Sequence, residues 1–549
     1  MALRGLIRYF ADSARQRLRF GRGSPLTGTA SLVPERPWEM TPSEQAAYHE
    51  FAARKIPADD LVDERVWADL EMPKVFGRLD RSATPAGSQY LLAQLKSYQT
   101  NPAALAANVH AWKTFQQSPE AGRKLREALR GFSQQSGARA AEFLFDAGTD
   151  TSPPPMSRWF RVLSTAAMAC SLGVVLNRWL FFPLLGIWLI NLMLHWHYGP
   201  SIGRHAPALR SVALMLSCVP AICRMVPEMD LPESSELRAL LGTATRLRGR
   251  ISKIFLRQFA TNEVVSILTD YLNLLCLVEL NSTCRALRAL HGEREALLKI
   301  FEALARLDAY QGLALALADC PAICVAETIT GRLFELTEVY HPLVENAVRN
   351  SLTGQGNSFL LSGANMAGKT TFMKAVAINL LLAQTLGLVL ARKARLPAVR
   401  LRTLIKRDDS ISGGHSYFFD EACELQRMIH QAEQSSTASW FFIDEIFRGT
   451  NSRERVAAGE ALLRYLNARW LVFASTHDQE LAGYLEHEFV SYYFSEVISG
   501  DQASFDYRLC QGFATHGNAI KLLKMAGFPK SVTDEADQLA QKAAAHTKG

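Results

Sequence analysis

A glycine-rich stretch that ends in Lys369 and Thr370 has the residue types from which phosphate sites are built. Residues 358–371 read SFLLSGANMAGKTT, so an apolar run leads into a G-x-x-x-x-G-K-T pattern that begins at Gly363. Glycines let backbone N–H groups curl around phosphate oxygens, and the positive N-terminus of the following helix faces the same anion. We predict that Lys369 reaches the β- and γ-phosphates of a nucleotide and that the Thr370 hydroxyl ligates Mg²⁺.

The surrounding residues supply the expected context for such a loop. The helix-forming run FMKAVAINLLLAQTLG follows the loop directly, which favours a nucleotide site over a fortuitous glycine-rich turn. The predicted nucleotide contacts are Gly363, Ala364, Asn365, Met366, Ala367, Gly368, Lys369, Thr370 and Thr371.

Two acidic residues close a second apolar stretch. Residues 439–445 read SWFFIDE, which is typical of a buried parallel strand that delivers its last residues to the carboxyl edge of a sheet. We predict that Asp444 binds Mg²⁺, directly or through water, and that Glu445 polarises the attacking water as the general base. The alternative is that the two acids only cap the next helix.

A third apolar stretch, WLVFASTH at 470–477, ends in His477, which we predict to sense the γ-phosphate. A lone histidine here would more often be a satisfied core residue, but the order of the three stretches favours the functional interpretation. Lys369, Glu445 and His477 are therefore the predicted catalytic residues. Strand, loop, helix, acidic strand, helix and strand predict an α/β doubly wound sheet with nucleotide at the strand C-termini.

The composition is that of a globular chain of several domains. Of 549 residues, 48% are hydrophobic and 21% are charged, and the net charge of +7 permits contact with nucleic acid or anionic lipid. Nine scattered cysteines indicate reduced cytosolic thiols. A linker rich in Pro, Ser and Thr precedes a predicted helix cap at Ser43. The predicted units are an N-terminal basic helix and linker (1–43), the first part of an all-α core (44–150), a transmembrane hairpin (159–198), the second part of the core (207–325), a nucleotide-binding domain (326–535) and a C-terminal tail (536–549).

The most apolar part of the chain lies at 159–198. Its segments 162–176 and 179–196 are close to the roughly 17–25 residues that a membrane-spanning helix needs. Tryptophans near the segment ends and flanking arginines favour a bilayer; these are Trp159, Trp179, Trp196, Arg158, Arg161 and Arg204. The alternative is a buried helical hairpin in a large core.

A two-span hairpin would return the chain to the side that it left. Both soluble parts would then share one compartment, so we predict an inner or cell membrane location with the nucleotide-binding domain in the cytoplasm. The neighbouring segment 207–224 is also apolar, but Arg210, Pro220 and Arg224 interrupt or bound it. We expect it to pack against protein instead.

Four segments together resemble the MutS family of DNA mismatch-repair ATPases. They are GANMAGKTT, DDSISGGHSYFFDEACEL (408–425), FFIDEIFRGTNSRER (441–455) and FASTHDQEL (473–481). Further similarity lies in VFGRLDRSATPAGSQYLLAQL (75–95), which resembles the opening of the family's helical core, and in 507–532, which resembles its C-terminal dimerising region.

This resemblance implies a homodimer with composite ATP sites, which uses ATP and Mg²⁺ to switch its helical core and has DNA as its partner. It also implies that Ser416 faces the γ-phosphate of the other subunit's ATP, and that Thr450 and Asn451 lie at the same interface.

The sequence also departs from the family pattern. Only about 60 residues precede the core-like segment, without a recognisable aromatic-x-Glu wedge, so we expect no mismatch-reading domain. The candidate hairpin stands where mismatch-repair members carry lever helices and a DNA clamp. Ala364 and Ala367 replace the usual Pro and Gly, and Phe447 replaces a Gly.

Two functions remain open on the sequence. The leading one is a membrane-anchored, MutS-like ATPase that binds DNA and is related to mismatch repair. The alternative is a membrane-bound signalling or remodelling ATPase without DNA or mismatch recognition. A scaffold with a degenerate site is disfavoured because every catalytic position holds a competent residue.

Overall fold

A computed structural model describes most of the chain. The described residues are 40–132, 140, 144–145, 156–203, 205–225, 231–252, 275–363, 368–405, 417–447, 452–499, 502–512 and 527–546. The predicted N-terminal basic helix lies outside them.

The first part of the helical core consists of short helices, most of which begin with proline. They are α2 (Pro42–Ala53), η1 (Ala58–Asp60), α3 (Glu64–Asp69), α4 (Met72–Leu79), α5 (Pro85–Leu95), α6 (Pro102–Gln117) and α7 (Pro119–Leu129). Proline fits the first turn of a helix because its missing N–H would have no helical partner there.

The cap of α2 is Thr41 and not the predicted Ser43. The Thr41 side chain accepts the backbone N–H of Glu44, whose carboxylate accepts the backbone N–H of Thr41. This reciprocal arrangement needs an acid three residues after the cap, and Thr41 is the residue at that spacing from Glu44.

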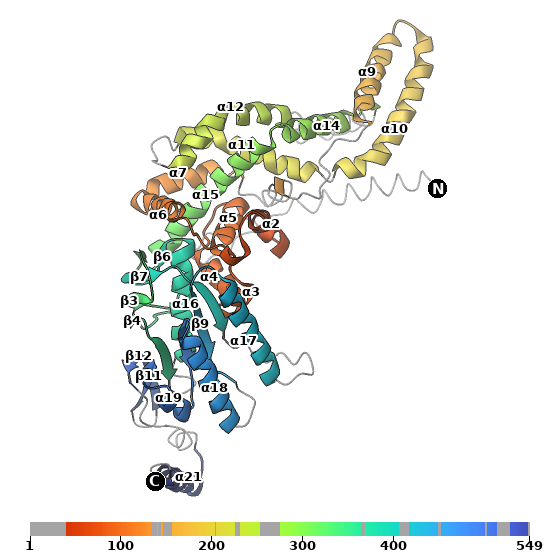
Figure 1. The fold of residues 1–549 in the computed structure, drawn as a ribbon. Helices are drawn as coiled ribbons and strands as arrows, with labels where there is room; N and C mark the ends of the chain where they lie inside the picture. Colours follow the sequence, from red (N-terminus) through yellow and green to blue (C-terminus); the bar gives the residue numbers. More distant parts are fainter. Residues whose placement is uncertain are drawn as a thin grey trace. The chain divides into compact units, whose positions relative to one another are not determined.

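The second part of the helical core has longer helices. They are α9 (Ser157–Gly173), η3 (Arg178–Leu180), α10 (Phe181–Gly203), α11 (Ala206–Met225), α12 (Pro232–Ser252), α14 (Val278–His291) and α15 (Arg294–Ala318). Helix α15 packs against α5, α6 and α12, so it joins both parts of the helical core (Figure 1).

Helices α9 and α10 form the hairpin whose segments the sequence predicted. Near its base the hairpin packs on the start of α14, where Phe160 is buried beside Leu277 and Asn191 donates to the Leu275 carbonyl. Most of its remaining apolar side chains are exposed, and Leu176 at 91% and Trp196 at 83% are extreme cases.

By length and composition alone, two helical segments among the described residues could cross a membrane. They are Arg178–Pro200, of which 11% is buried, and Pro207–Arg224, of which 44% is buried. One side of the second segment packs into the protein core, where Val212, Leu216 and Val219 are fully buried. The prediction that 207–224 packs against protein is therefore confirmed.

The rest of the described chain forms an α/β domain with two larger sheets and a small one. Its strands are β1 (Cys324–Val325), β2 (Glu327–Ile329), β3 (Leu333–Val339), β4 (Asn350–Gln355), β5 (Ser358–Ser362), β6 (Leu388–Val389), β7 (Lys393–Pro397), β8 (Arg400–Leu404), β9 (Ser439–Asp444), β10 (Leu471–Ser475), β11 (Phe489–Ser499) and β12 (Gln502–Gln511). Its helices are α16 (Lys369–Thr385), α17 (Tyr417–Gln434), α18 (Ser452–Asn467), α19 (Gln479–Tyr484) and α21 (Lys530–His546), the last of which crosses the predicted boundary between 535 and 536.

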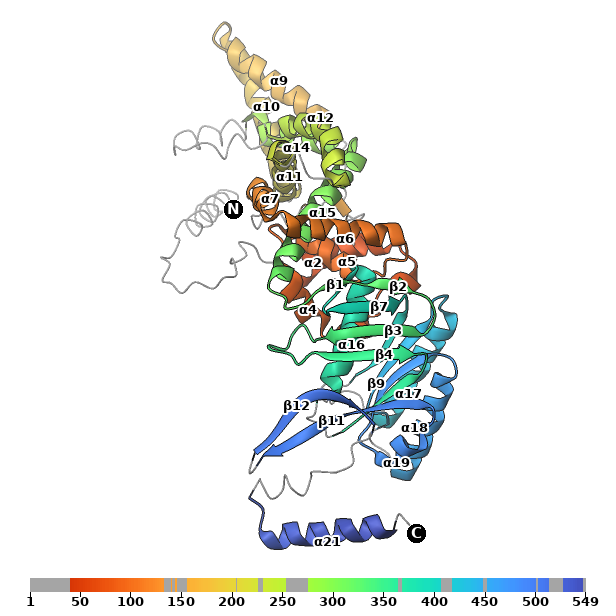
Figure 2. The same cartoon turned by 90° about the vertical axis from the view of Figure 1, so that its left-hand side faces the viewer.

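The main sheet has the strand order β12-β11-β5-β10-β9-β8, in which only β12 is antiparallel to its neighbour. A four-stranded sheet, β2-β7-β3-β4, accompanies it (Figure 2). The short strands β1 and β6 form a further pair. Side chains on one face of the main sheet, such as Phe442 and Phe473, join the cluster that includes α16 residues. Phe441 and Val472 on the opposite face join residues of α17 and α18. Helices therefore cover both faces, as the doubly wound prediction requires.

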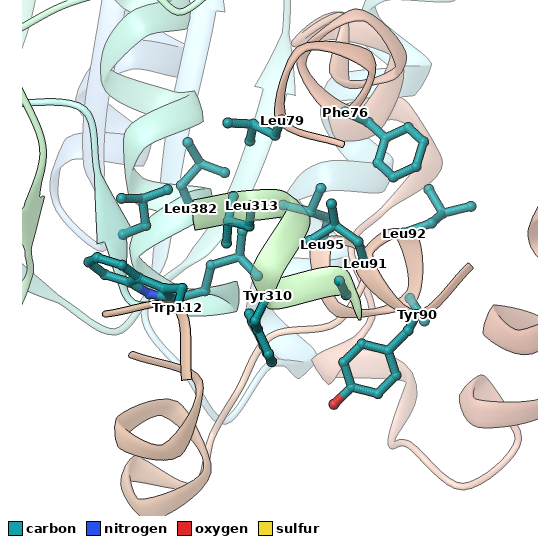
Figure 3. Close-up of a cluster of buried hydrophobic side chains, with 14 of the residues drawn as sticks. Phe76, Leu79, Tyr90, Leu91, Leu92, Leu95, Trp112, Tyr310, Leu313 and Leu382 are labelled. Carbon is teal, nitrogen blue, oxygen red and sulfur yellow. The ribbon is translucent and has the colours of Figure 1, made fainter. Parts of the chain in front are cut away.

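The helical core and the α/β domain share one hydrophobic core. In Figure 3, Leu382 of α16 lies among side chains of the helical core that include Trp112, Tyr310 and Leu313. The Trp112 indole N–H also donates to the Leu386 carbonyl at 3.3 Å. The helix that begins at Lys369 is therefore packed directly into the helical core.

Candidate functional site

The predicted phosphate loop joins strand β5 to helix α16. Gly363 follows β5 with φ of 126° and Gly368 precedes α16 with φ of 101°, conformations that L-residues with a side chain rarely adopt. Lys369 opens the helix with 2% of its surface exposed, and its Nζ donates to the Gly363 carbonyl at 2.5 Å. Residues 364–367 lie outside the described residues. The Lys369 side chain is thus held beside Gly363, at the start of the predicted loop.

The predicted metal ligands lie in direct contact. Thr370 Oγ1 donates to Asp444 Oδ2 at 2.8 Å, and Ser475 Oγ donates to Asp444 Oδ1. Strand β10 lies between β5 and β9, so Ser475 at its end is placed beside Asp444. Sequence reasoning missed Ser475, although a polar residue at the end of an apolar strand is the signal that could have found it.

Glu445 and His477 meet at the same sheet edge. The Glu445 backbone N–H donates to the Ser475 carbonyl at 3.2 Å, and His477 Nδ1 lies 3.7 Å from Glu445 Oε2. The Glu445 side chain is 5% exposed, whereas that of His477 is 44% exposed. A buried carboxylate beside an exposed imidazole is an arrangement in which the acid can take a proton from water and the imidazole can meet an incoming anion.

The residue after His477 is held by an ion pair. Arg455 of α18 makes two hydrogen bonds to the Asp478 carboxylate, of 3.1 and 2.9 Å. Paired guanidinium and carboxylate groups fix relative orientation as well as distance. Helix α18 therefore anchors the chain next to His477, which follows strand β10 by two residues.

Tyr507 of β12 is a site residue that the sequence did not predict. A Cβ atom added to Gly368 would lie 3.1 Å from Tyr507 Cδ1, so the aromatic ring borders the phosphate loop. Asn350 donates to the Tyr507 carbonyl at 3.0 Å, and the backbone of Tyr507 has a positive φ of 53°. A partly exposed ring in this place offers a flat surface on which a nucleobase can stack. No motif spacing signals this residue.

Several predicted residues cannot be placed. Ala364, Asn365, Met366, Ala367, Ser416, Thr450 and Asn451 lie outside the described residues. Of the others, the structure brings Gly363, Gly368, Lys369, Thr370, Asp444, Glu445 and His477 to one edge of the main sheet, and Thr371 follows in the first turn of α16.

An α/β domain with a buried lysine, a threonine and two carboxylates at the carboxyl edge of parallel strands has the arrangement expected of the nucleotide-binding class. The sequence agrees with this class and makes it specific, because residues 359–544 match MutS domain V. Residues 359–544 therefore form a MutS-family domain, and the relatives support a MutS-family protein.

Individual relatives support the same family. Proteins named DNA mismatch repair protein MutS from Natronomonas pharaonis, Thermus thermophilus and Parasynechococcus marenigrum are 28%, 31% and 33% identical to this chain over 260, 267 and 252 residues. The matches cover 43%, 47% and 43% of this chain, but only 30%, 32% and 27% of the three relatives. The chain therefore matches less than a third of the length of these relatives.

Proposed function

We propose that this chain is a membrane-anchored ATPase that binds ATP with Mg²⁺ at the edge of the main sheet and uses hydrolysis to switch a homodimer. DNA is the proposed partner, because the relatives are named as DNA mismatch repair proteins. The contact that carries the proposal is the 2.8 Å hydrogen bond between Thr370 and Asp444, residues 74 positions apart in the chain.

The donor set at this contact suits magnesium. A hydroxyl and a carboxylate are hard oxygen ligands, and Mg²⁺ usually takes one or two protein oxygens together with phosphates and water. Bound there through Thr370 and Asp444, the ion would neutralise negative charge on the phosphate oxygens.

Each of the remaining site residues has its own proposed role in binding or hydrolysis. Lys369 holds the β- and γ-phosphates, and the backbone from Gly363 to Gly368 cradles them. Glu445 orients the attacking water and takes its proton, while Ser475 holds the backbone of Glu445 in place. His477 contacts the γ-phosphate from its exposed position.

The proposed dimer and its switch are inferred from the similarity to MutS proteins. In the proposed dimer, Ser416 contacts the γ-phosphate of the ATP in the partner subunit, with Thr450 and Asn451 at the same interface. Helix α16 begins at the phosphate loop and ends in the core that it shares with the helical part, as the Trp112 contact to Leu386 illustrates. A movement of α16 would therefore be passed to the helical core.

The membrane part of the proposal rests on the hairpin. Helix α10 has 23 residues, or about 35 Å at 1.5 Å per residue, against a hydrocarbon core of about 30 Å. Helix α9 has 17 residues and is shorter, at about 26 Å. Residues 156–227 contain no Asp or Glu, and Arg158 and Arg161 are exposed at the hairpin base. Positive charge at the base favours entry from the cytoplasmic side.

Hydrolysis is tested with one variant and one control. Glu445→Ala should lower phosphate release by about 100-fold or more while ATP remains bound, because only the proton acceptor is lost. Glu486→Ala, an exposed acid in the same domain, should leave the turnover unchanged. Unchanged turnover in Glu445→Ala would contradict the assignment of the general base.

Membrane anchoring is tested by fractionation of the full chain. A spanning hairpin should stay with the membranes during alkaline carbonate extraction. Release of the intact protein into the supernatant would show that α9 and α10 do not span.

A membrane-bound signalling or remodelling ATPase without DNA recognition is the second candidate. The exposed apolar hairpin favours it, since a bilayer anchor is needed for that function and not for DNA binding. Binding of homoduplex, mismatched and branched DNA should be measured at several salt concentrations. Salt-dependent binding supports the DNA-binding form, and the absence of any such binding supports the second candidate.

A further inference from the structure

The turn that follows Glu445 is conformationally unusual. Glu445 and Phe447 have φ values of 54° and 56°, in the left-handed region that normally favours glycine. Between them, Ile446 is buried against α18, where a Cβ atom on Gly459 would lie 3.2 Å from the Ile446 side chain. Two strained residues around a buried anchor require contacts that hold the turn.

The contact on the far side of this turn comes from α17. The backbone N–H of Phe447 donates to Glu421 Oε1 at 2.7 Å, and Glu421 is buried. The Phe447 ring also packs against Phe418 of the same helix, with 5.0 Å between ring centroids. On the near side, Ser475 holds the Glu445 backbone. Hydrogen bonds to Ser475 and Glu421 therefore fix both ends of the segment from Glu445 to Phe447.

We infer that Glu421 is a positioning residue for hydrolysis, which fixes the Glu445–Phe447 turn by accepting the Phe447 N–H. A glycine at 447 would adopt φ of 56° without strain, whereas phenylalanine needs compensation. The short hydrogen bond that Glu421 accepts from the Phe447 N–H supplies that compensation. The inference rests on the proposed ATPase function, because it assigns Glu421 a role through Glu445.

The contact between Glu421 and Phe447 also connects the turn to helix α17. Helix α17 begins at Tyr417, directly after Ser416, which is the residue proposed to contact the ATP of the partner subunit. A shift of α17 would move the Glu421 carboxylate and with it the Phe447 backbone. In the proposed dimer, Glu421 would thus connect movement of α17 to the position of the proposed general base.

The test uses the full chain in detergent and separates kcat from KM. Glu421→Ala should lower kcat by about 10- to 100-fold, because a buried hydrogen bond that holds the turn is lost. KM for ATP should change less than about 3-fold, since Lys369 and Thr370 are not touched. Glu421→Gln keeps a carbonyl acceptor and should stay within about 3-fold of the parent kcat.

The double variant Phe447→Gly with Glu421→Ala distinguishes a positioning role of Glu421 from a purely structural one. In the Phe447→Gly background the turn no longer needs the bond, so adding Glu421→Ala should cost less than about 3-fold in kcat. An equal loss in both backgrounds would overturn the inference.

Hydrogen exchange keeps the two proposals distinguishable. The Phe447 amide should exchange faster in Glu421→Ala and at the parent rate in Glu421→Gln, whether or not the chain hydrolyses ATP. Glu445-dependent hydrolysis that survives Glu421→Ala would overturn the positioning role and leave the ATPase proposal standing. If no Glu445-dependent hydrolysis exists, the proposed function and the positioning role fail together, while the exchange result still decides whether Glu421 holds the turn.

Discussion

Asp69, at the end of α3 in the helical core, accepts a hydrogen bond of 3.0 Å from the backbone N–H of Ile405, just past strand β8 of the α/β domain. The same carboxylate oxygen accepts the Thr403 hydroxyl at 3.0 Å, and Asp69 is buried. This polar contact joins the two parts of the chain beside the shared apolar core, to which Leu70 and Ile405 both belong.

Replacement of Asp69 should therefore destabilise the whole chain. In Asp69→Ala the Thr403 hydroxyl and the Ile405 N–H lose their buried acceptor, at a cost of about 2–3 kcal/mol. Glu64→Ala in the same helix breaks only an exposed pair with Lys96 and should cost less than about 1 kcal/mol. Denaturant unfolding of both variants measures the difference, and equal stabilities would contradict the role of Asp69.

The Thr370 hydroxyl should be needed for magnesium-dependent nucleotide binding. Thr370→Val keeps the shape of the side chain but removes the oxygen, and kcat/KM for ATP should fall on the order of 10- to 100-fold. Thr370→Ser keeps the oxygen and should retain most of the activity. Titration of Mg²⁺ at fixed ATP shows whether the loss lies in metal affinity, and indistinguishable titrations for valine and serine would count against Thr370 as a ligand.

Gly368 should not tolerate a side chain. Its φ of 101° and the 3.1 Å approach of Tyr507 Cδ1 to an added Cβ both oppose alanine. A conformational cost of about 1–2 kcal/mol corresponds to roughly 5- to 30-fold weaker ATP binding. Gly483→Ala, where an added Cβ meets no atom within 4 Å, is the matched control and should bind ATP as the parent does.

His341 should make stability depend on pH. Burial, together with the nearby Lys374 ammonium, lowers the pKa of His341 to about 4. As pH falls below 6.5 the unfolded chain takes up the proton first, so the stability that is present above pH 6.5 is lost as pH falls towards 4. The loss should be about 2 kcal/mol by pH 5.

The control for this pH effect is the variant His341→Asn. His341 Nδ1 accepts the Leu343 N–H at 3.1 Å, and the amide oxygen of His341→Asn can accept it without titrating. Thermal unfolding of both proteins at pH 7.5 and pH 5.0 should show a smaller shift for the variant. Equal shifts would assign the pH dependence to other groups.

A charge on the hairpin should impair membrane insertion. Leu189 of α10 is 60% exposed, and arginine near the centre of a membrane helix costs about 2.5–3.5 kcal/mol. Leu189→Arg should therefore shift protein out of the carbonate-resistant fraction. Leu315→Arg changes an exposed leucine of α15 outside the hairpin and should not. Equal fractions for the two variants would argue against insertion of the hairpin.

The sequence predicted those site residues whose positions follow from neighbours in the chain. The loop from Gly363 to Thr371 is local, and Asp444 and His477 each end or follow an apolar strand, so their place at a sheet edge follows from strand polarity. The helical character of 42–129 and the burial of 207–224 were likewise readable from apolar spacing and its interruptions.

Only the tertiary structure decided which distant segments of the chain lie in contact. Strand order places β10 between β5 and β9, which brings Ser475 to Asp444, and no local pattern contains that order. Tyr507 reaches Gly368 across the sheet, and Glu421 reaches Phe447 from a separate helix.

The physical reason is that periodicity records which face of an element is apolar, but not which element covers that face. The site residues with their own motif were therefore determined by the sequence itself. The groups that hold them in position were decided only by packing, as was the core in which Trp112 and Leu382 join the helical part to the α/β domain.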